Sequence, residues 1–195
     1  MPFALRSLAG VALVAMLASA IAAVPAAAVA PVVRLPDLDG RVVDPFAASA
    51  GASAIVFLFT SVDCPISNRY APVVDRLHET FQSQGTAFWL IYPNLSESAE
   101  RIRTHLDAFS YHLRALRDPQ HALVKLAGAS VTPEVALYDR RQRLVYHGRI
   151  DDRYVSLGLE RPVPTKHDLE DALSATLAGK PLREAAAPAV GCFIE

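Results

Sequence analysis

A strand that runs directly into a cysteine and an amphipathic helix constrains this chain more than any other feature. Residues 54–60, AIVFLFT, are an unbroken apolar run rich in aromatic and β-branched side chains, which predicts a strand buried on both faces. The polar segment SVDCP follows it. The next apolar side chains recur at helical spacing: Ile66, Tyr70, Val73, Val74, Leu77 and Phe81. Cys64 is therefore predicted at the first turn of a helix.

A cysteine in that position ionises more easily than an ordinary one. Unpaired backbone N–H groups and the helix dipole favour negative charge there, and the thiolate is the nucleophilic form of the side chain. Asp63 opposes the effect through like-charge repulsion. We predict that Cys64 is a reactive thiol, and the alternative is a buried, inert cysteine.

Strands and helices alternate along the rest of the chain. Predicted strands are a hairpin at 32–46 around Asp39-Gly40, a buried strand at 87–92, a short strand at 113–117 and two strands within 131–150. Predicted helices are one opened by Asn94 and Glu97 that runs to about Ser110, one over Pro119–Ala127, and one opened by Thr165 and Asp168. This alternation predicts an α/β sandwich with a mixed central sheet.

Composition excludes several classes of protein. The 195 residues carry 19 basic and 20 acidic side chains, so the chain is not a generally basic nucleic-acid binder. The hydrophobic share of 52% excludes a disordered chain. Two cysteines are too few for a disulfide-scaffolded miniprotein or a four-thiolate zinc site.

The N-terminal segment has the order of a secretory signal. Within residues 1–28 the single charge is Arg6, an apolar run follows it, and Ala26-Ala27-Ala28 supplies a small-residue cleavage site. We predict a signal peptide at 1–28, a folded domain at 29–180 and a tail at 181–195, exported to the periplasm or secreted. An uncleaved membrane anchor is the alternative, and only then would a membrane be a partner.

Residues 54–72, AIVFLFTSVDCPISNRYAP, resemble the strand–loop–helix of the thioredoxin-like superfamily. In that superfamily a proline follows the first active cysteine by eight residues, as Pro72 follows Cys64. Val131-Thr132-Pro133 resembles its cis-proline loop, which faces the active cysteine. The early strand pair and the length are most similar to the redoxin and thiol-peroxidase (AhpC/TSA-like) branch. The resemblance implies a three-layer sandwich with an N-terminal strand extension and a cis Thr132–Pro133 bond.

The resemblance also implies where the active site lies, with two departures. Phe57 stands where the peroxiredoxin loop signature begins with a proline. Ser67 stands where the superfamily has its second cysteine, so Cys64 has no local disulfide partner. Cys192, in the tail, is the other thiol of the chain. We predict a site of Cys64, Ser67, Pro133 and Cys192, in which the tail brings Cys192 to Cys64 for a disulfide or for shared metal ligation. The alternative is a disordered tail with a free or intermolecular thiol.

Two residues of the final predicted hairpin are further candidates. His147 could join Cys64 and Cys192 in a thiolate–imidazole site suited to copper or zinc, although a structural histidine is the default interpretation. Arg149 could stabilise a thiolate or a peroxide anion, and the default is a salt-bridged loop residue. The histidines at 78, 105, 112, 121 and 167 are predicted to be ordinary surface residues.

Three functions fit these observations. The first is an exported thiol oxidoreductase or peroxidase that has Cys64 as its nucleophile, needs no cofactor, and acts on a thiol or disulfide protein or on a peroxide. The second is a copper-handling protein of the same fold that uses Cys64, Cys192 and His147. The third is a non-catalytic thioredoxin-like binding module.

Overall fold

The computed structural model describes Met1 and residues 32–195. The predicted signal peptide at 1–28 and its cleavage site therefore lie, apart from Met1, outside the described residues. Among the helices of the described residues, none is both long enough and apolar enough to span a bilayer.

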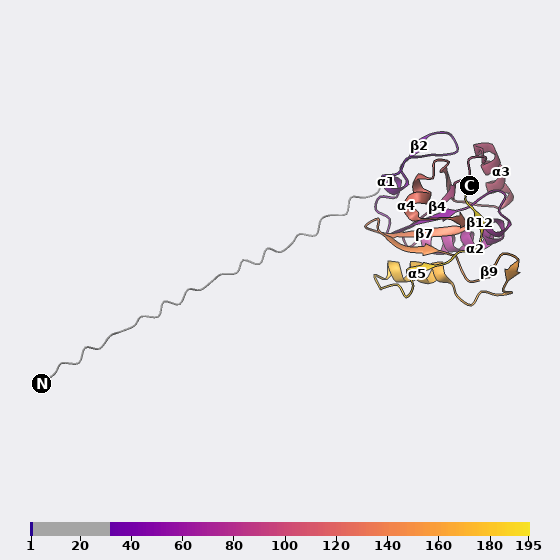
Figure 1. The fold of residues 1–195 in the computed structure, drawn as a ribbon. Helices are drawn as coiled ribbons and strands as arrows, with labels where there is room; N and C mark the ends of the chain where they lie inside the picture. Colours follow the sequence, from indigo (N-terminus) through magenta and orange to yellow (C-terminus); the bar gives the residue numbers. More distant parts are fainter. Residues whose placement is uncertain (2–31) are drawn as a thin grey trace.

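A six-stranded mixed sheet forms the centre of the molecule (Figure 1). Its strands, in spatial order, are β11 (Ala186–Ala187), β8 (Leu144–Gly148), β7 (Glu134–Asp139), β3 (Ala54–Phe59), β4 (Thr86–Tyr92) and β5 (Arg114–Arg117). β3, β4 and β5 run parallel, β7 is antiparallel to both β3 and β8, and β11 is parallel to β8. The predicted mixed sheet is confirmed, and β11 is a strand that the sequence did not indicate.

Helices cover both faces of the sheet and give the predicted three layers. Because side chains alternate along a strand, Val56 and Leu58 of β3 join one core while Phe57 and Phe59 join the other. The first core includes residues from α2 (Pro65–Gln82), α3 (Ala99–Ala108) and α5 (Asp168–Leu177). The second includes residues from α1 (Pro45–Ala48) and α4 (Ala122–Ala127). Figure 1 shows α5 and α4 on opposite sides of the sheet.

Within the described residues, three two-stranded pairs lie outside the central sheet. β1 (Leu35–Pro36) and β2 (Val42–Val43) form the predicted N-terminal hairpin. β9 (Tyr154–Ser156) and β10 (Leu159–Glu160) form a hairpin that the sequence did not indicate. The third pair joins β6 (Val131–Thr132) to β12 (Cys192–Phe193), so the tail returns to the loop that precedes β7.

Two predicted capping boxes are wrong. α3 begins after Ser98, whose hydroxyl accepts the N–H of Arg101, and neither Asn94 nor Glu97 caps it. α5 begins at Asp168 after His167, while the Thr165 hydroxyl donates to Asp152. Short polar residues bond to whichever partners the tertiary structure offers, and spacing along the chain does not reveal those partners.

The helix predicted from Pro119 begins three residues later than expected. His121 adopts the left-handed conformation, with φ at 57°, and α4 begins at Ala122. Asp118 is fully buried and accepts the N–H groups of Ala122, Leu123 and Val124 at 2.7–2.9 Å. One carboxylate thus satisfies three of the backbone donors that a helix start leaves unpaired.

Asp118→Ala is expected to lower the free energy of unfolding by about 2 kcal/mol, because three buried N–H groups lose their acceptor. Urea unfolding measures the change. Asp107→Ala, on the exposed surface of α3, is the matched control and should stay within about 0.5 kcal/mol of the parent. Equal losses in the two variants would contradict this role for Asp118.

Candidate active site

Cys64 lies at the N-cap of α2, where the sequence predicted it. Its side chain is only 1% exposed, and its Sγ donates a hydrogen bond to the carbonyl oxygen of Thr132 at 3.0 Å. The Cys64 carbonyl accepts the first helical bond from the Asn68 N–H, and its own N–H donates to Ser61. The thiol is thus held between the first turn of α2 and the loop that contains Thr132.

A buried carboxyl group supports the loop that leads to Cys64. Oε1 of Glu97 accepts the Ser61 hydroxyl at 2.8 Å and the Val62 N–H at 2.6 Å. Asn94 donates its side-chain amide to the same Ser61 hydroxyl at 3.1 Å. The two residues expected to cap α3 therefore fix the backbone just before the cysteine. No local sequence signal could have revealed this, since the partners lie more than thirty residues away.

A second set of contacts holds the same loop from the side of α2 and α3. The Asn68 amide donates to the carbonyl of Val62, and its oxygen lies 2.8 Å from Nε2 of His105. His105 also lies 2.8 Å from the Tyr92 hydroxyl through Nδ1 and is only 3% exposed, so its prediction as a surface residue is wrong. Burial lowers the pKa of His105. Arg101 pairs with both oxygens of Asp63.

The Thr132–Pro133 bond is cis, as predicted, and the residue after it locks the loop. Glu134 is buried, and its Oε2 accepts the N–H of Ser130 at 2.7 Å and of Val131 at 3.2 Å. Its Oε1 lies 3.0 Å from Nε2 of His147. Burial alone would raise the pKa of Glu134, but the nearby His147 ring and the hydrogen bonds from the two N–H groups hold it below the ordinary value.

The tail is ordered and brings Cys192 to Cys64. Cys192 stands opposite Thr132 in the antiparallel β12–β6 ladder, and the carbonyl of that same Thr132 accepts the Cys64 thiol. The alternative of a disordered tail is therefore wrong. Both cysteines are free thiols in the structure, so the disulfide stays a prediction.

The two thiols differ in acidity. Burial opposes ionisation of Cys64, but hydrogen bonds from Cys192 and Ser67 stabilise the thiolate and give Cys64 a lowered pKa. Burial and the hydrogen bond to Cys64 raise the pKa of Cys192 to about 12. Ser67 stands where the superfamily has a cysteine and is buried. Its hydroxyl, which has no hydrogen-bond partner in the described structure, can donate to Cys64 once that thiol ionises. Cys64 is therefore the more acidic of the two thiols.

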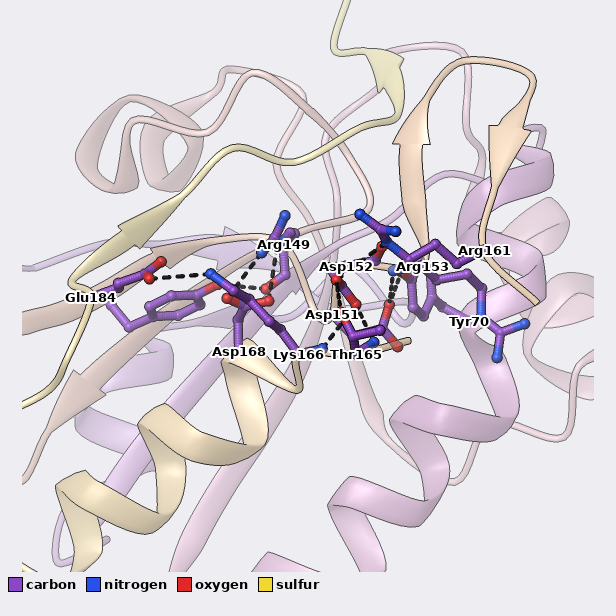
Figure 2. A network of polar contacts seen from close by, with 11 residues as sticks. Tyr70, Arg149, Asp151, Asp152, Arg153, Arg161, Thr165, Lys166, Asp168 and Glu184 are labelled. Carbon is purple, nitrogen blue, oxygen red and sulfur yellow. Dashed lines mark hydrogen bonds and ion pairs between the residues drawn. The ribbon is translucent and has the colours of Figure 1, made fainter. Parts of the chain in front are cut away.

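His147 and Arg149 are both engaged away from the two cysteines. His147 pairs with Glu134, and in the described part of the chain no three side chains of the metal-binding types gather at one place. Copper binding by Cys64, Cys192 and His147 stays a prediction. Arg149 donates Nε to Asp168 at 2.8 Å, within the polar network after β8 (Figure 2). The default interpretation of Arg149 as a salt-bridged loop residue is confirmed.

Comparison with known proteins agrees with this geometry. The profile of the AhpC/TSA family matches residues 26–147. The chain belongs to the AhpC/TSA family. The matched range includes Cys64, the loop that supports it and Thr132–Pro133, whereas Cys192 lies beyond it. This AhpC/TSA-family protein is thus a member of the redoxin branch of the thioredoxin superfamily, within the family of thioredoxin-like thiol oxidoreductases.

Solved structures resemble it over most of its length. A hypothetical protein from Sinorhizobium meliloti 1021 is 31% identical, with a TM-score of 0.72 over 85% of this chain and 91% of its own. An uncharacterized conserved protein from Geobacillus kaustophilus is 26% identical, with a TM-score of 0.75 over 85% of this chain and 89% of its own.

A third structure shares the fold alone. It is a secreted Mycobacterium tuberculosis disulfide oxidoreductase, 16% identical, with a TM-score of 0.52 over 75% of this chain and 95% of its own. No curated protein matches the sequence.

The pKa values of the two thiols predict how they react. In the reduced protein, the alkylation rate of Cys64 should have a pH midpoint below the roughly 8.5 of a free cysteine, and that of Cys192 a much higher one. Ser67→Ala removes a donor to the thiolate and should move the Cys64 midpoint upward. Peptide mass mapping of iodoacetamide-treated protein measures both rates. Equal pH profiles for the two thiols would contradict the assignment.

Glu97 should make stability depend on pH. Burial raises the pKa of Glu97, despite the hydrogen bonds from Val62 and Ser61. Because the pKa of Glu97 is higher in the folded state than in the unfolded state, Glu97 stabilises the fold most at low pH. This stabilisation is lost as pH rises from the unfolded-state pKa through the folded-state pKa. Glu97→Gln keeps the hydrogen-bond acceptor and removes the charge. The free energy of unfolding of this variant minus that of the parent should therefore increase between about pH 4 and pH 8.

The matched variants separate this effect from general surface charge. Glu97→Ala should lose about 1–3 kcal/mol, because the Ser61 hydroxyl and the Val62 N–H lose their buried acceptor. Glu100→Gln, at an exposed position on α3, should show no pH-dependent gain. Urea unfolding at the two pH values measures all three. An advantage of Glu97→Gln that does not change with pH would contradict the buried-charge argument.

Proposed function

We propose that this protein is an exported thiol–disulfide oxidoreductase in which Cys64 is the nucleophile and Cys192 is its resolving partner. The observation that carries the proposal is the placement of both cysteines at Thr132: Cys192 stands opposite it in the β12–β6 ladder, and its carbonyl accepts the Cys64 thiol. The pKa of Cys64 is lowered and that of Cys192 is raised. The N-terminal segment, with Arg6 before a long apolar run, supports export to a compartment where disulfides persist.

The exchange proceeds in two steps. The Cys64 thiolate attacks one sulfur of a partner disulfide, forms a mixed disulfide, and releases the other partner sulfur as a thiolate. Cys192 then loses its proton, attacks the Cys64 sulfur, and releases the second partner thiolate. The partner gains two electrons and becomes a dithiol, and the enzyme gains a Cys64–Cys192 disulfide. The reverse sequence oxidises a partner dithiol.

A protein disulfide suits this site better than a peroxide does. Arg149, the candidate for stabilising a peroxide anion, is paired with Asp168. Arg101 is paired with Asp63, in the loop that precedes Cys64. Cys64 is buried and bonds to Thr132, a residue of the strand β6 that pairs with an extended segment, β12. Both observations favour a polypeptide substrate, and peroxidase activity is an outcome that the test below distinguishes.

The test is turnover with a peptide disulfide and with hydrogen peroxide. Cys192→Ser should accumulate a mixed disulfide at Cys64 in a single turnover and then stop, because no second thiol resolves it. Cys64→Ser should not react. Mass spectrometry and thiol release measure both. If the parent consumes peroxide catalytically and leaves peptide disulfides intact, or if Cys192→Ser turns over as well as the parent, the proposal is overturned.

A further inference from the structure

A two-stranded hairpin is attached to the helix that begins after Cys64. Among the described strands, β9 and β10 pair only with each other. Glu160 of β10 accepts a hydrogen bond from the guanidinium of Arg69, on α2, at 2.8 Å. Tyr154 of β9 lies against Tyr70, the next residue of α2, with the two ring centroids 5.6 Å apart. Two consecutive residues of α2 thus hold the hairpin.

Two buried carboxylates fix the base of the hairpin (Figure 2). Asp152 accepts both the N–H and the hydroxyl of Thr165 at 2.6 Å, so it ties the chain that enters the hairpin to the chain that leaves it. Asp151 accepts the Tyr70 hydroxyl and the Arg153 N–H. The polar network after β8 therefore presents the hairpin at a fixed place beside α2.

The outer face of the hairpin is apolar and exposed. Because side chains alternate along a strand, Val155 and Leu159 point away from the face that contacts α2. These two side chains and Leu157, in the turn between the strands, are between 48% and 67% exposed. Residues 155–159, VSLGL, contain no charged side chain. Apolar side chains gathered on a fixed, uncharged surface are typical of an interaction site.

The hairpin lies close enough to Cys64 for one partner to cover both. Arg69 and Tyr70 follow Cys64 by five and six residues, which is about 8 Å along a helix axis. An ordinary protein interface buries about 800 Å² on each partner, equivalent to a disc with a radius of about 16 Å. Figure 1 shows β9 on the same side of the molecule as β12, which carries Cys192. An interface of that size centred on Cys64 therefore includes the point where the hairpin is attached.

A folded protein fits this surface better than a lipid bilayer or a second copy of the chain does. Two arginines beside the hairpin are paired with carboxylates, Arg69 with Glu160 and Arg161 with Asp152. Anionic lipid is bound by clusters of basic residues without such partners. β9 has three residues and β10 has two, so pairing between the hairpins of two copies would supply few backbone bonds.

We propose that the outer face of the β9–β10 hairpin is the docking surface for the protein that exchanges disulfides with Cys64. This partner is a folded thiol or disulfide protein with an apolar patch beside its own cysteine. The inference rests on the proposed function and names the partner class of that site. Val155, Leu157 and Leu159 carry no reactive group, so they act on association of the partner and leave the chemistry of Cys64 unchanged.

The first experiment compares a folded substrate with a small one. Reduced full-length Leu157→Gln/Leu159→Gln should react with the disulfides of insulin about tenfold more slowly than the parent, because two apolar contacts are lost. Its rate with glutathione disulfide should equal that of the parent. The matched control is Val42→Gln/Leu126→Gln, which changes exposed apolar side chains on β2 and α4 and should keep both parental rates. If the two double variants react equally with insulin, or if the glutathione disulfide rate falls as much as the insulin rate, the docking surface is overturned.

The second experiment locates the contact directly. Cys192→Ser is trapped as a mixed disulfide between Cys64 and insulin, and separately as one between Cys64 and glutathione. Backbone amides of residues 154–160 should exchange hydrogen more slowly in the insulin adduct than in the glutathione adduct. Equal exchange in the two adducts would overturn the assignment of the hairpin.

The other two occupants are tested with the same variant. Flotation of the parent with phosphatidylglycerol vesicles, or its sedimentation as a dimer, would overturn the proposal if Leu157→Gln/Leu159→Gln abolished that behaviour. Absence of both behaviours in the parent supports a protein partner.

Failure of this inference is distinguishable from failure of the proposed function. If oxidation of the parent joins Cys64 to Cys192 and insulin is reduced, but the hairpin variant reacts like the parent, the redox pair stands and the docking surface is wrong. If no such disulfide forms, the proposed function itself is wrong.

Discussion

The short backbone ladder between β12 and β6 is the interaction on which the site depends. It sets Cys192 opposite Thr132, and the carbonyl of Thr132 is the acceptor of the Cys64 thiol. A shift of one residue would turn the Cys192 side chain to the other face of the strand and away from Cys64. Gly191 fixes this register, because no other residue type fits against the Thr132 carbonyl.

Two buried carboxyl groups hold the two loops that meet at Cys64, and their electrostatics differ. Glu134 accepts two backbone N–H groups and lies beside the His147 ring, and these contacts outweigh burial and lower its pKa. Glu97 accepts the Val62 N–H and the Ser61 hydroxyl but has no cationic partner among its hydrogen bonds, so burial dominates and its pKa is raised. The first holds the loop that faces Cys64, and the second holds the loop that precedes it.

Sequence predicted the fold well because the central strands are continuous apolar runs, a signal that depends on burial alone. The position of Cys64 followed from the change of periodicity at the strand–helix junction, and the cis bond at Thr132–Pro133 followed from family resemblance. The roles of Glu97 and His105 could not be predicted, since their partners are distant in sequence and their spacing also fits a helix cap or an exposed helix face. β11 and β12 have two residues each and gain their order from the sheet edges they meet.

The most direct test of the account is an oxidative titration of the full-length protein, followed by intact-mass analysis and mapping of the cysteine peptides. The account predicts that a monomer loses two hydrogens in one step and that the Cys64 and Cys192 peptides are recovered joined by a disulfide. Recovery of Cys64 as a sulfenic or sulfinic acid with Cys192 still a free thiol, or of disulfides only between separate molecules, would contradict it.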